Sequence, residues 1–337
     1  MNDTLKHEIL LHLEKTTASS DWTISGKTID SRECQIFRAS SLNHHHDIAI
    51  KVYRKNSPIS DTHHNALEEN ERIFNQLSNE YRIPQSYGYL KQHQVYMMEW
   101  INAPTLQYRL LRFCYHNTKQ QNDIARTFKW LKQYHLRYGE LPEKPVDIEW
   151  YCIHLQSYLE KMDPNKKLQK NKVFSLGLET LKSKAQIFEK LVVPLAKTHG
   201  DFTPSNVLID DKTTTCIDLH DCNSQPITDE ISLQLSYLST GYINMLSRRH
   251  MQSPPQEWEL LNTALDAYGY SNSQIQREFL LYVFLYQLLR RWLVIFERNE
   301  SRRTPILDIW SLWHKEIVVE GVSKVLLNLS KTETSTD

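Results

Sequence analysis

The chain is poor in glycine. Only 8 of its 337 residues are glycine, and Gly26 is the only one before Gly88. A Gly-x-Gly-x-x-Gly loop over bound phosphates is therefore excluded from the first 87 residues, because such a loop needs glycines where its backbone approaches the phosphate. In place of such a loop, we expect backbone amides of a turn at Ser25–Arg32 to approach a phosphate, but less tightly.

The sequence also lacks paired cysteines, an excess of charge of one sign, and a signal peptide. Its five cysteines are scattered without a Cys-x-x-Cys pair, and residues 1–20 contain no continuous apolar segment. We therefore expect reduced thiols and a cytoplasmic protein. Lys+Arg and Asp+Glu both total 40, so no strong positive field favours nucleic acid as a partner.

Long apolar runs are scarce, and the strongest is Phe279–Phe296. Gln287 and the pair Arg290-Arg291 interrupt it. Two adjacent arginines near the centre of a membrane span cost several kcal/mol, so the run predicts a buried helix and no transmembrane segment. Peripheral membrane contact is left open.

The pattern of apolar residues changes character near residue 101. Short strand-like segments with one helix among them precede Pro104, and two of these segments, Cys34–Ala39 and Asp47–Tyr53, suggest a hairpin. Segments with helical periodicity follow Pro104, and Ser175–Leu195 is one of them. We predict an α+β protein of two lobes: a small β-rich lobe over residues 1–101 and a larger helical lobe over residues 102–330. Residues 331–337 are polar and are expected to form a disordered tail.

One run of residues has the composition of a catalytic loop. His199-Gly200-Asp201 is followed by Asn206, and Asp218 comes after a short polar turn. An amide oxygen at Asn206 and a carboxylate at Asp218 are hard ligands that suit Mg²⁺, and Asp201 would accept a proton from a hydroxyl. A solvated turn explains the same residue types, but apolar runs flank these acids, where an unliganded charge is costly.

The run resembles the signature of the aminoglycoside and choline kinase branch of the protein-kinase-like superfamily. In this chain it is HGDFTPSNVLID followed by CIDLHD. The resemblance implies a bilobal protein-kinase-like fold that binds ATP and Mg²⁺. It also implies that Asp201 is the catalytic base, that Asn206 and Asp218 hold the metal, and that His199 supports the loop.

A second segment resembles the strand whose lysine holds the α- and β-phosphates in kinases. It is Ile48-Ala49-Ile50-Lys51-Val52, and an edge-strand lysine is the ordinary alternative. A glutamate on the next helix should pair with Lys51, but the expected position is Asn70. Either Glu71 or Glu69 reaches Lys51, or the ion pair is absent; we take Glu71 as the candidate.

A third segment resembles the hinge between kinase lobes. It runs from Val95 to Ile101 and leads into Pro104. By this resemblance backbone groups near Glu99 and Ile101 would pair with adenine, and Met98 would line the back of the nucleotide pocket. A core strand is the alternative interpretation.

The predicted activity is that of an ATP-dependent phosphotransferase that uses an alcohol group as acceptor. The acceptor is a small molecule or a glycan: an aminoglycoside, a choline-like compound or a lipopolysaccharide-core sugar. Basic pairs in the helical half, Arg290-Arg291 among them, would suit an anionic glycan, although solvated helix faces account for such pairs more often. A protein kinase and a non-catalytic pseudokinase that acts as a binding module are the alternatives.

Overall fold

The structure is a computed structural model of the whole chain. It describes residues 1–31, 34–54, 68–69, 71–74, 76–113, 116–220, 223–240, 259–270, 273–302 and 306–332. These residues form two compact units. The first comprises Met1–Pro104, His199–Asp201 and Asn206–Cys222, and the second comprises the rest. Residues of the predicted catalytic loop thus pack with the β-rich unit, although the sequence placed them in the helical lobe.

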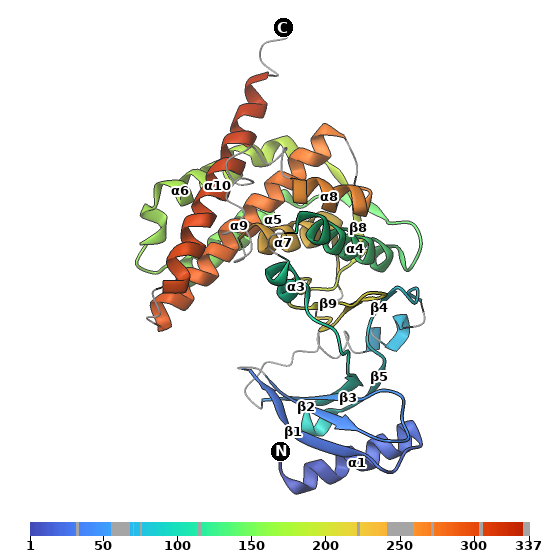
Figure 1. Ribbon diagram of the computed structural model, residues 1–337. Coiled ribbons are helices and arrows are strands. Elements are labelled where there is room, and N and C mark those ends of the chain that lie inside the picture. The colour runs from blue at the N-terminus through green and yellow to red at the C-terminus, as the bar shows by residue number, and fades with distance from the viewer. Residues whose placement is uncertain are drawn as a thin grey trace. The chain divides into compact units, whose positions relative to one another are not determined.

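A five-stranded antiparallel sheet forms the centre of the first unit (Figure 1). The order is β1-β2-β3-β6-β5, with β1 at Thr23–Asp30, β2 at Cys34–Ser40, β3 at Ile48–Tyr53, β6 at Val95–Glu99 and β5 at Ser86–Leu90. The β2–β3 hairpin that the sequence predicts is present, and it pairs Ile36 with Lys51. The sheet therefore brings the lysine strand directly beside the hinge strand, because β3 also pairs with β6.

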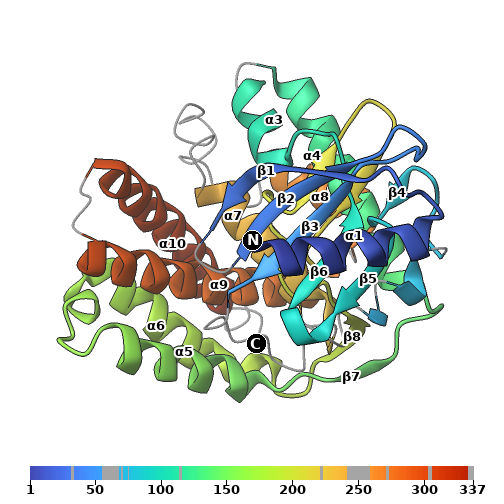
Figure 2. The same ribbon diagram turned by 90° about the horizontal axis from the view of Figure 1, so that it is seen from below.

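The two faces of this sheet have different partners because side chains alternate along each strand. Ile48 and Ile50 pack on one face, together with Ile9 and Leu13 of helix α1 (Asp3–Thr17). Figure 2 shows α1 lying across the strands. The sequence analysis did not anticipate α1. With one face covered by this helix, the opposite face, which carries Lys51, is the one that remains for a ligand.

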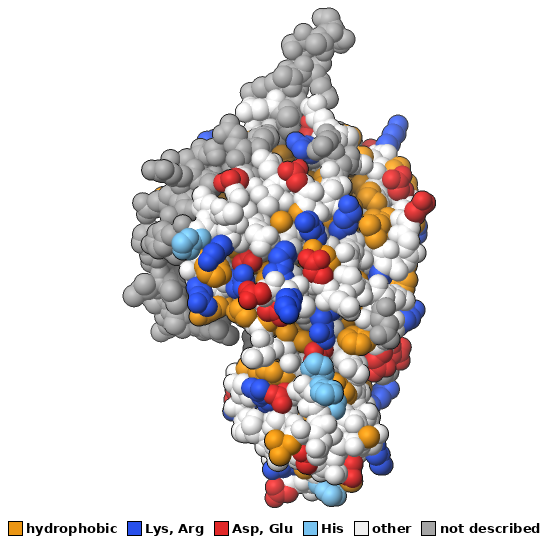
Figure 3. Space-filling model, turned by 45° about the vertical axis from the view of Figure 1, so that its right-hand side comes forward, with side chains coloured by type: hydrophobic (Ala, Val, Ile, Leu, Met, Phe, Trp, Pro, Cys, Tyr) orange, Lys and Arg blue, Asp and Glu red, His pale blue; other side chains and the backbone are white. Residues whose placement is uncertain are grey.

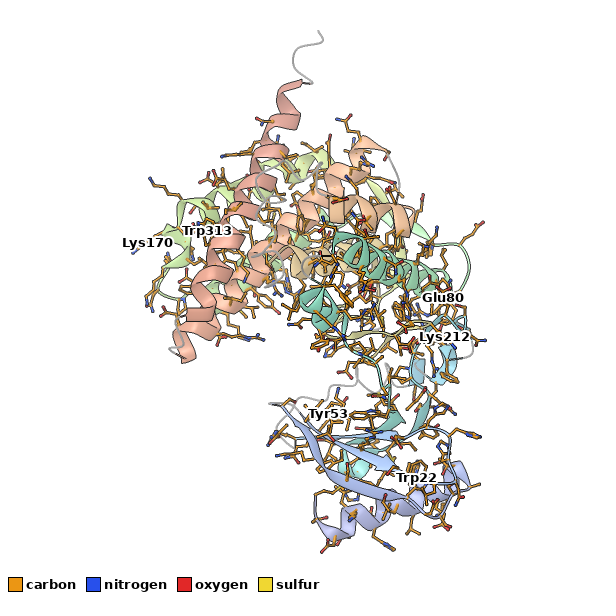
Figure 4. All side chains as sticks on the ribbon, in the orientation of Figure 1. Trp22, Tyr53, Glu80, Lys170, Lys212 and Trp313 are labelled. Atoms are coloured by element: carbon orange, nitrogen blue, oxygen red, sulfur yellow. The ribbon has the colours of Figure 1, made fainter. Side chains whose placement is uncertain are left out.

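A smaller three-stranded sheet attaches the predicted catalytic loop to the first unit. Its order is β4-β10-β9, with β4 at Tyr81–Arg82, β10 at Thr214–Cys216 and β9 at Val207–Ile209. The β9–β10 turn is closed by Asp210, whose carboxylate accepts hydrogen bonds from the amides of Lys212 and Thr213. Beside it, the Thr214 amide donates to the Glu80 carbonyl at 2.8 Å, so Glu80 and Lys212 lie close together in Figure 4.

Helices make up most of the second unit. They are α3 (Leu106–Arg112), α4 (Asn117–Leu136), α5 (Ile148–Met162), α6 (Lys172–Lys184), α7 (Ile227–Thr240), α8 (Glu259–Tyr268), α9 (Gln274–Arg302) and α10 (Ile306–Thr332). The helix α9 packs against α5, α6, α7 and α10. Its Gln274–Arg298 segment is long and apolar enough to cross a membrane, but most of it is buried in the protein, as the sequence predicted. Residues 333–337 of the expected tail lie outside the described residues.

The second unit also contains a sheet that periodicity did not predict. The helix expected over Ser175–Leu195 ends at Lys184, and residues Val192–Lys197 form strand β8. The β-branched pair Val192-Val193 and the ring of Pro194, which has no N–H for a helical bond, favour extended backbone here. Strand β8 pairs with β7 (Glu143–Pro145) and β11 (Ser224–Pro226), and it leads directly to His199.

We predict that α1 is an integral part of the first unit. Leu13→Ala should lower the free energy of unfolding by about 2–4 kcal/mol, because Leu13 is fully buried against the sheet. Leu11→Ala, on the solvent side of the same helix at 42% exposure, is the matched control and should cost less than about 0.5 kcal/mol. Urea unfolding measures both. Equal losses would show that α1 does not pack as described.

Candidate active site

The loop after β8 is shaped by glycine and histidine. Gly200 has a φ of +85°, a conformation that side chains rarely adopt. The Asp201 amide donates to Nδ1 of the buried His199 at 3.3 Å. Nδ2 of Asn206 donates to the main-chain carbonyl of Asp201 at 2.9 Å and to its carboxylate at 2.8 Å. Asp201 and Asn206 are therefore held together, and the amide oxygen of Asn206 is turned away from these two bonds.

The β9–β10 hairpin brings Asp218 to the same place. Val207 pairs with Cys216, and the Ile217 amide donates to the Asn206 carbonyl at 2.9 Å. Asp218 itself has a φ of +61°. A left-handed conformation costs a non-glycine residue free energy, and such residues concentrate at functional sites. Asp201, Asn206 and Asp218, the candidate residues from the sequence, thus lie on one short hairpin and the loop before it.

Electrostatics separates Asp201 from an ordinary surface aspartate. Although the residue keeps an exposed surface, the protein packed around its carboxyl desolvates it and raises its pKa. The negative charge of Asp218 adds to the rise, and His199, Asn206 and His220 oppose it. A raised pKa means that this carboxylate binds a proton more readily than most aspartates do.

Lys51 points from β3 to the hairpin. Its Nζ lies 2.8 Å from Oδ1 of Asp218, and the residue is only 8% exposed. Burial by itself lowers the pKa of a lysine, but the Asp218 carboxylate outweighs it, so the pKa of Lys51 is raised and the ammonium stays charged. The ion pair ties the central strand of the large sheet to the hairpin that carries the predicted metal ligands.

Glu71 is not the partner of Lys51 in this structure. It accepts a hydrogen bond from the Ser86 hydroxyl at 2.9 Å, and the buried Glu69 pairs with Arg72. The alternative position, Asn70, lies outside the described residues. A contact between Glu71 and Lys51 in a nucleotide-bound state stays a prediction.

The hinge segment is fixed by main-chain bonds and keeps one donor that a base would need. The Trp100 amide donates to the Asp47 carbonyl, which fixes the segment to the end of β3. On the other side, the Glu99 amide donates to the Gln85 carbonyl, while the Gln85 amide donates to the Glu99 carboxylate. Within the described residues, the Ile101 amide takes no main-chain partner, so this donor is available.

Two residues on the Lys51 face were missed by the sequence analysis. Tyr53 lies two residues after Lys51, and its ring centroid is 5.0 Å from the lysine Nζ (Tyr53 is labelled in Figure 4). Cys34 is its cross-strand partner and is buried. The alternation of β3 would have revealed Tyr53, because residues two apart share a face. The same face carries a small apolar cluster of Ala49, Tyr96 and Met98.

The expected phosphate turn at Ser25–Arg32 is mostly strand. β1 continues to Asp30, so only Ser31 of the described residues belongs to the turn. Arg54, just after β3, donates to the Asp30 carboxylate at 2.5 Å and to the Ser31 carbonyl at 3.1 Å. An arginine therefore anchors the end of β1 in a protein that has no glycine-rich loop to do so.

The donors on this hairpin fit a magnesium ion bound together with phosphate. Mg²⁺ in kinase-type sites is usually held by one or two protein oxygens, and phosphate and water complete its shell. Asn206 offers an amide oxygen and Asp218 offers its carboxylate, while the described residues contain no group of three or more His, Cys, Asp or Glu that could hold a metal alone. The set suits a metal that arrives with a nucleotide.

Comparison with solved structures identifies the fold of this chain. No family model and no curated protein matches the sequence. Solved structures do match along almost the whole chain. A choline/ethanolamine kinase family protein from Mesorhizobium loti superimposes with a TM-score of 0.58 over 94% of this chain and 99% of its own, at 10% identity. The chain therefore has a kinase-like fold.

Two further structures agree with this assignment. Amicoumacin kinase hAmiN in complex with AMP-PNP, Ca²⁺ and Ami gives a TM-score of 0.53 over 95% of this chain and 96% of that one, at 11% identity. The aminoglycoside phosphotransferase APH(4)-Ia gives 0.51 over 95% and 99%, at 13% identity. The predicted kinase-like fold is confirmed, with one antiparallel sheet in the first unit and a helical second unit.

We predict that Lys51, and not Glu71, controls nucleotide affinity. Lys51→Met should weaken ATP binding at least about tenfold, because a desolvated ammonium would no longer face the phosphates. Glu71→Gln keeps the hydrogen bond from Ser86 and should change the affinity less than about twofold. Calorimetric titration with Mg·ATP measures both. A loss in Glu71→Gln as large as in Lys51→Met would contradict the pairing described above.

Proposed function

We propose that this protein is an ATP-dependent phosphotransferase that moves the γ-phosphate to a hydroxyl group of a small molecule or glycan. The observation that carries the proposal is the clustering of Lys51, Asp201, Asn206 and Asp218 in one unit of a kinase-like fold. Each has the chemistry that phosphoryl transfer needs: a cation, a proton acceptor and two hard oxygen ligands.

The role of each residue follows from its contacts. Lys51, already aligned by Asp218, would hold the α- and β-phosphates. Asn206 and Asp218 would hold Mg²⁺, which neutralises charge on the phosphate oxygens when bound. Main-chain groups near Glu99 and the Ile101 amide would pair with adenine, with Met98 packed behind them on the same sheet face.

Asp201 would act on the acceptor. Its carboxylate orients the acceptor hydroxyl and accepts the proton as the hydroxyl oxygen forms its bond to the γ-phosphorus. The bond from that phosphorus to the β-phosphate oxygen breaks, and ADP leaves with the electron pair. The raised pKa of Asp201 supports this role, because it makes the carboxylate a better proton acceptor.

The nature of the acceptor is supported by the structural neighbours. These neighbours are named as kinases or phosphotransferases of small molecules, which favours a small hydroxyl compound over a protein substrate. Charge on the surface adds no preference for a polyanion such as nucleic acid. On the face shown in Figure 3, basic and acidic side chains of the described residues are interspersed.

We predict that Asp201→Ala abolishes turnover by several orders of magnitude while ATP still binds, because the base acts on the chemical step. Asp211→Ala, on the exposed β9–β10 turn, is the matched control and should stay fully active.

In the wild-type protein, kcat should fall as the pH is lowered, with a midpoint above pH 3.8, since the Asp201 base must be ionised and its pKa is raised. Release of ADP is measured against amino sugars, choline analogues, core oligosaccharides and generic protein substrates. Full activity of Asp201→Ala would refute its role.

We predict that Asp218→Asn removes the Mg²⁺ dependence of nucleotide binding. It should also lower the stability of the nucleotide-free protein by about 3 kcal/mol, because it leaves the buried Lys51 without its carboxylate. Thermal shifts with ATP, in the presence and absence of Mg²⁺, measure the first effect. If wild type itself shows no shift, the pseudokinase alternative is favoured over an active enzyme.

A further inference from the structure

Among the described residues of the second unit, no carboxylate holds the guanidinium group of Arg291. Arg291 on α9 faces α7, and its Cζ lies 3.6 Å from the ring centroid of Tyr237. Its Nε donates to the Thr240 hydroxyl at 2.7 Å. That hydroxyl gives its own proton to the Ser236 carbonyl at 2.5 Å, so its lone pairs are left to accept from Arg291. Both the plane and the direction of the guanidinium are therefore fixed.

Among the described residues, none places a negative charge beside Arg291. Desolvation by the packed helices lowers the pKa of Arg291, a hydrogen bond with the Tyr237 side chain opposes this fall, and the nearby Arg298 lowers the pKa further. Apart from Tyr237 and Thr240, no described residue offers its guanidinium an acceptor. An arginine does not lose its proton in a protein, so the charge remains. A desolvated charge without a counter-ion is costly, and structures retain one where it has a ligand.

Other arginines of this chain show how the charge of a guanidinium group is neutralised in this protein. Arg109 makes two bonds to the Asp123 carboxylate, Arg82 pairs with Glu99, and Arg38 pairs with Asp47. Arg137 lies over the ring of Tyr134 as Arg291 lies over Tyr237, but it donates to two main-chain carbonyls. Arg291 has the aromatic support of Arg137 without those acceptors.

We propose that Arg291, Tyr237 and Thr240 form a binding site for a carboxylate or phosphate group of a small organic ligand. The guanidinium of Arg291 is already fixed by Thr240 at its Nε and by Tyr237 at its face. Its terminal N–H groups, beyond the one that bonds Tyr237, are donors for such an oxyanion, and little conformational entropy is left to lose on binding. Arg298 adds positive potential from the same helix. Resting on the proposed function, the ligand is the phosphoryl acceptor, which is then a hydroxyl compound that carries an acidic group.

The site is tested by binding, with the nucleotide site filled. Glucuronate, glucose 6-phosphate, glucose and inorganic phosphate are titrated calorimetrically into the full chain in saturating Mg·AMP-PNP, whose three phosphates fill the positions where a phosphate would otherwise bind beside Lys51. We expect saturable binding of a sugar acid or sugar phosphate and none of glucose. Arg291→Met should weaken it at least about tenfold, and Arg291→Lys, which keeps the charge but not the fork, by an intermediate factor.

The neighbouring Arg290→Met is the matched control, because Arg290 lies over Tyr158 on α5, whereas Arg291 lies over Tyr237. It should bind the same compounds within about twofold of wild type. Unchanged ADP binding and circular dichroism show that the variants are folded. Equal affinity of Arg291→Met and wild type, or no saturable binding of any acidic probe by wild type, would overturn the site.

Transfer assays separate this inference from the proposed function. If the bound acid is not phosphorylated, the oxyanion site stands and its assignment to the acceptor is wrong; binding of inorganic phosphate as tightly as the sugar compounds would say the same. If neutral hydroxyl compounds are phosphorylated with the same KM by wild type and Arg291→Met, the proposed function stands and the assignment of the oxyanion site to the acceptor is refuted.

Discussion

The ion pair between Lys51 and Asp218 connects the parts of the sequence that have to meet for phosphoryl transfer. Lys51 lies in the middle of the large sheet, and Asp218 lies at the end of a hairpin more than 160 residues later in the chain. Because the ammonium is buried, its charge is costly without that carboxylate. The left-handed backbone of Asp218 and the hydrogen bonds between Asp201 and Asn206 are arranged around this contact.

The sheet makes the contact possible by separating its two faces. Helix α1 covers the face that carries Ile48 and Ile50, and the other face keeps Lys51, Tyr53 and a small apolar cluster. The hinge strand lies beside β3, so groups that would bind the base and groups that would bind the phosphates share one surface. The missing glycine-rich loop is offset locally by Arg54, which anchors the end of β1.

Sequence alone predicted the kinase-like fold, because the run from His199 to Asn206, Asp218 and the lysine strand follow the order of a known signature. It failed where tertiary pairing decides local structure. Residues 192–195 were expected to end a helix but belong to β8, which lies between two strands, and α1 was not expected although its Ile9 and Leu13 are core residues. That no described carboxylate bonds Arg291 could not be predicted either, since it depends on what surrounds the helix in space.

We propose that this hairpin and the Lys51 strand together bind Mg·ATP, and a crystal structure of the full chain with AMP-PNP and Mg²⁺ is the decisive test. We expect the metal to be bound by oxygens of Asn206 and Asp218, the triphosphate to contact Lys51, and adenine to pair with the main chain at Glu99 and Ile101. A nucleotide bound elsewhere, or a metal held by other residues, would contradict it.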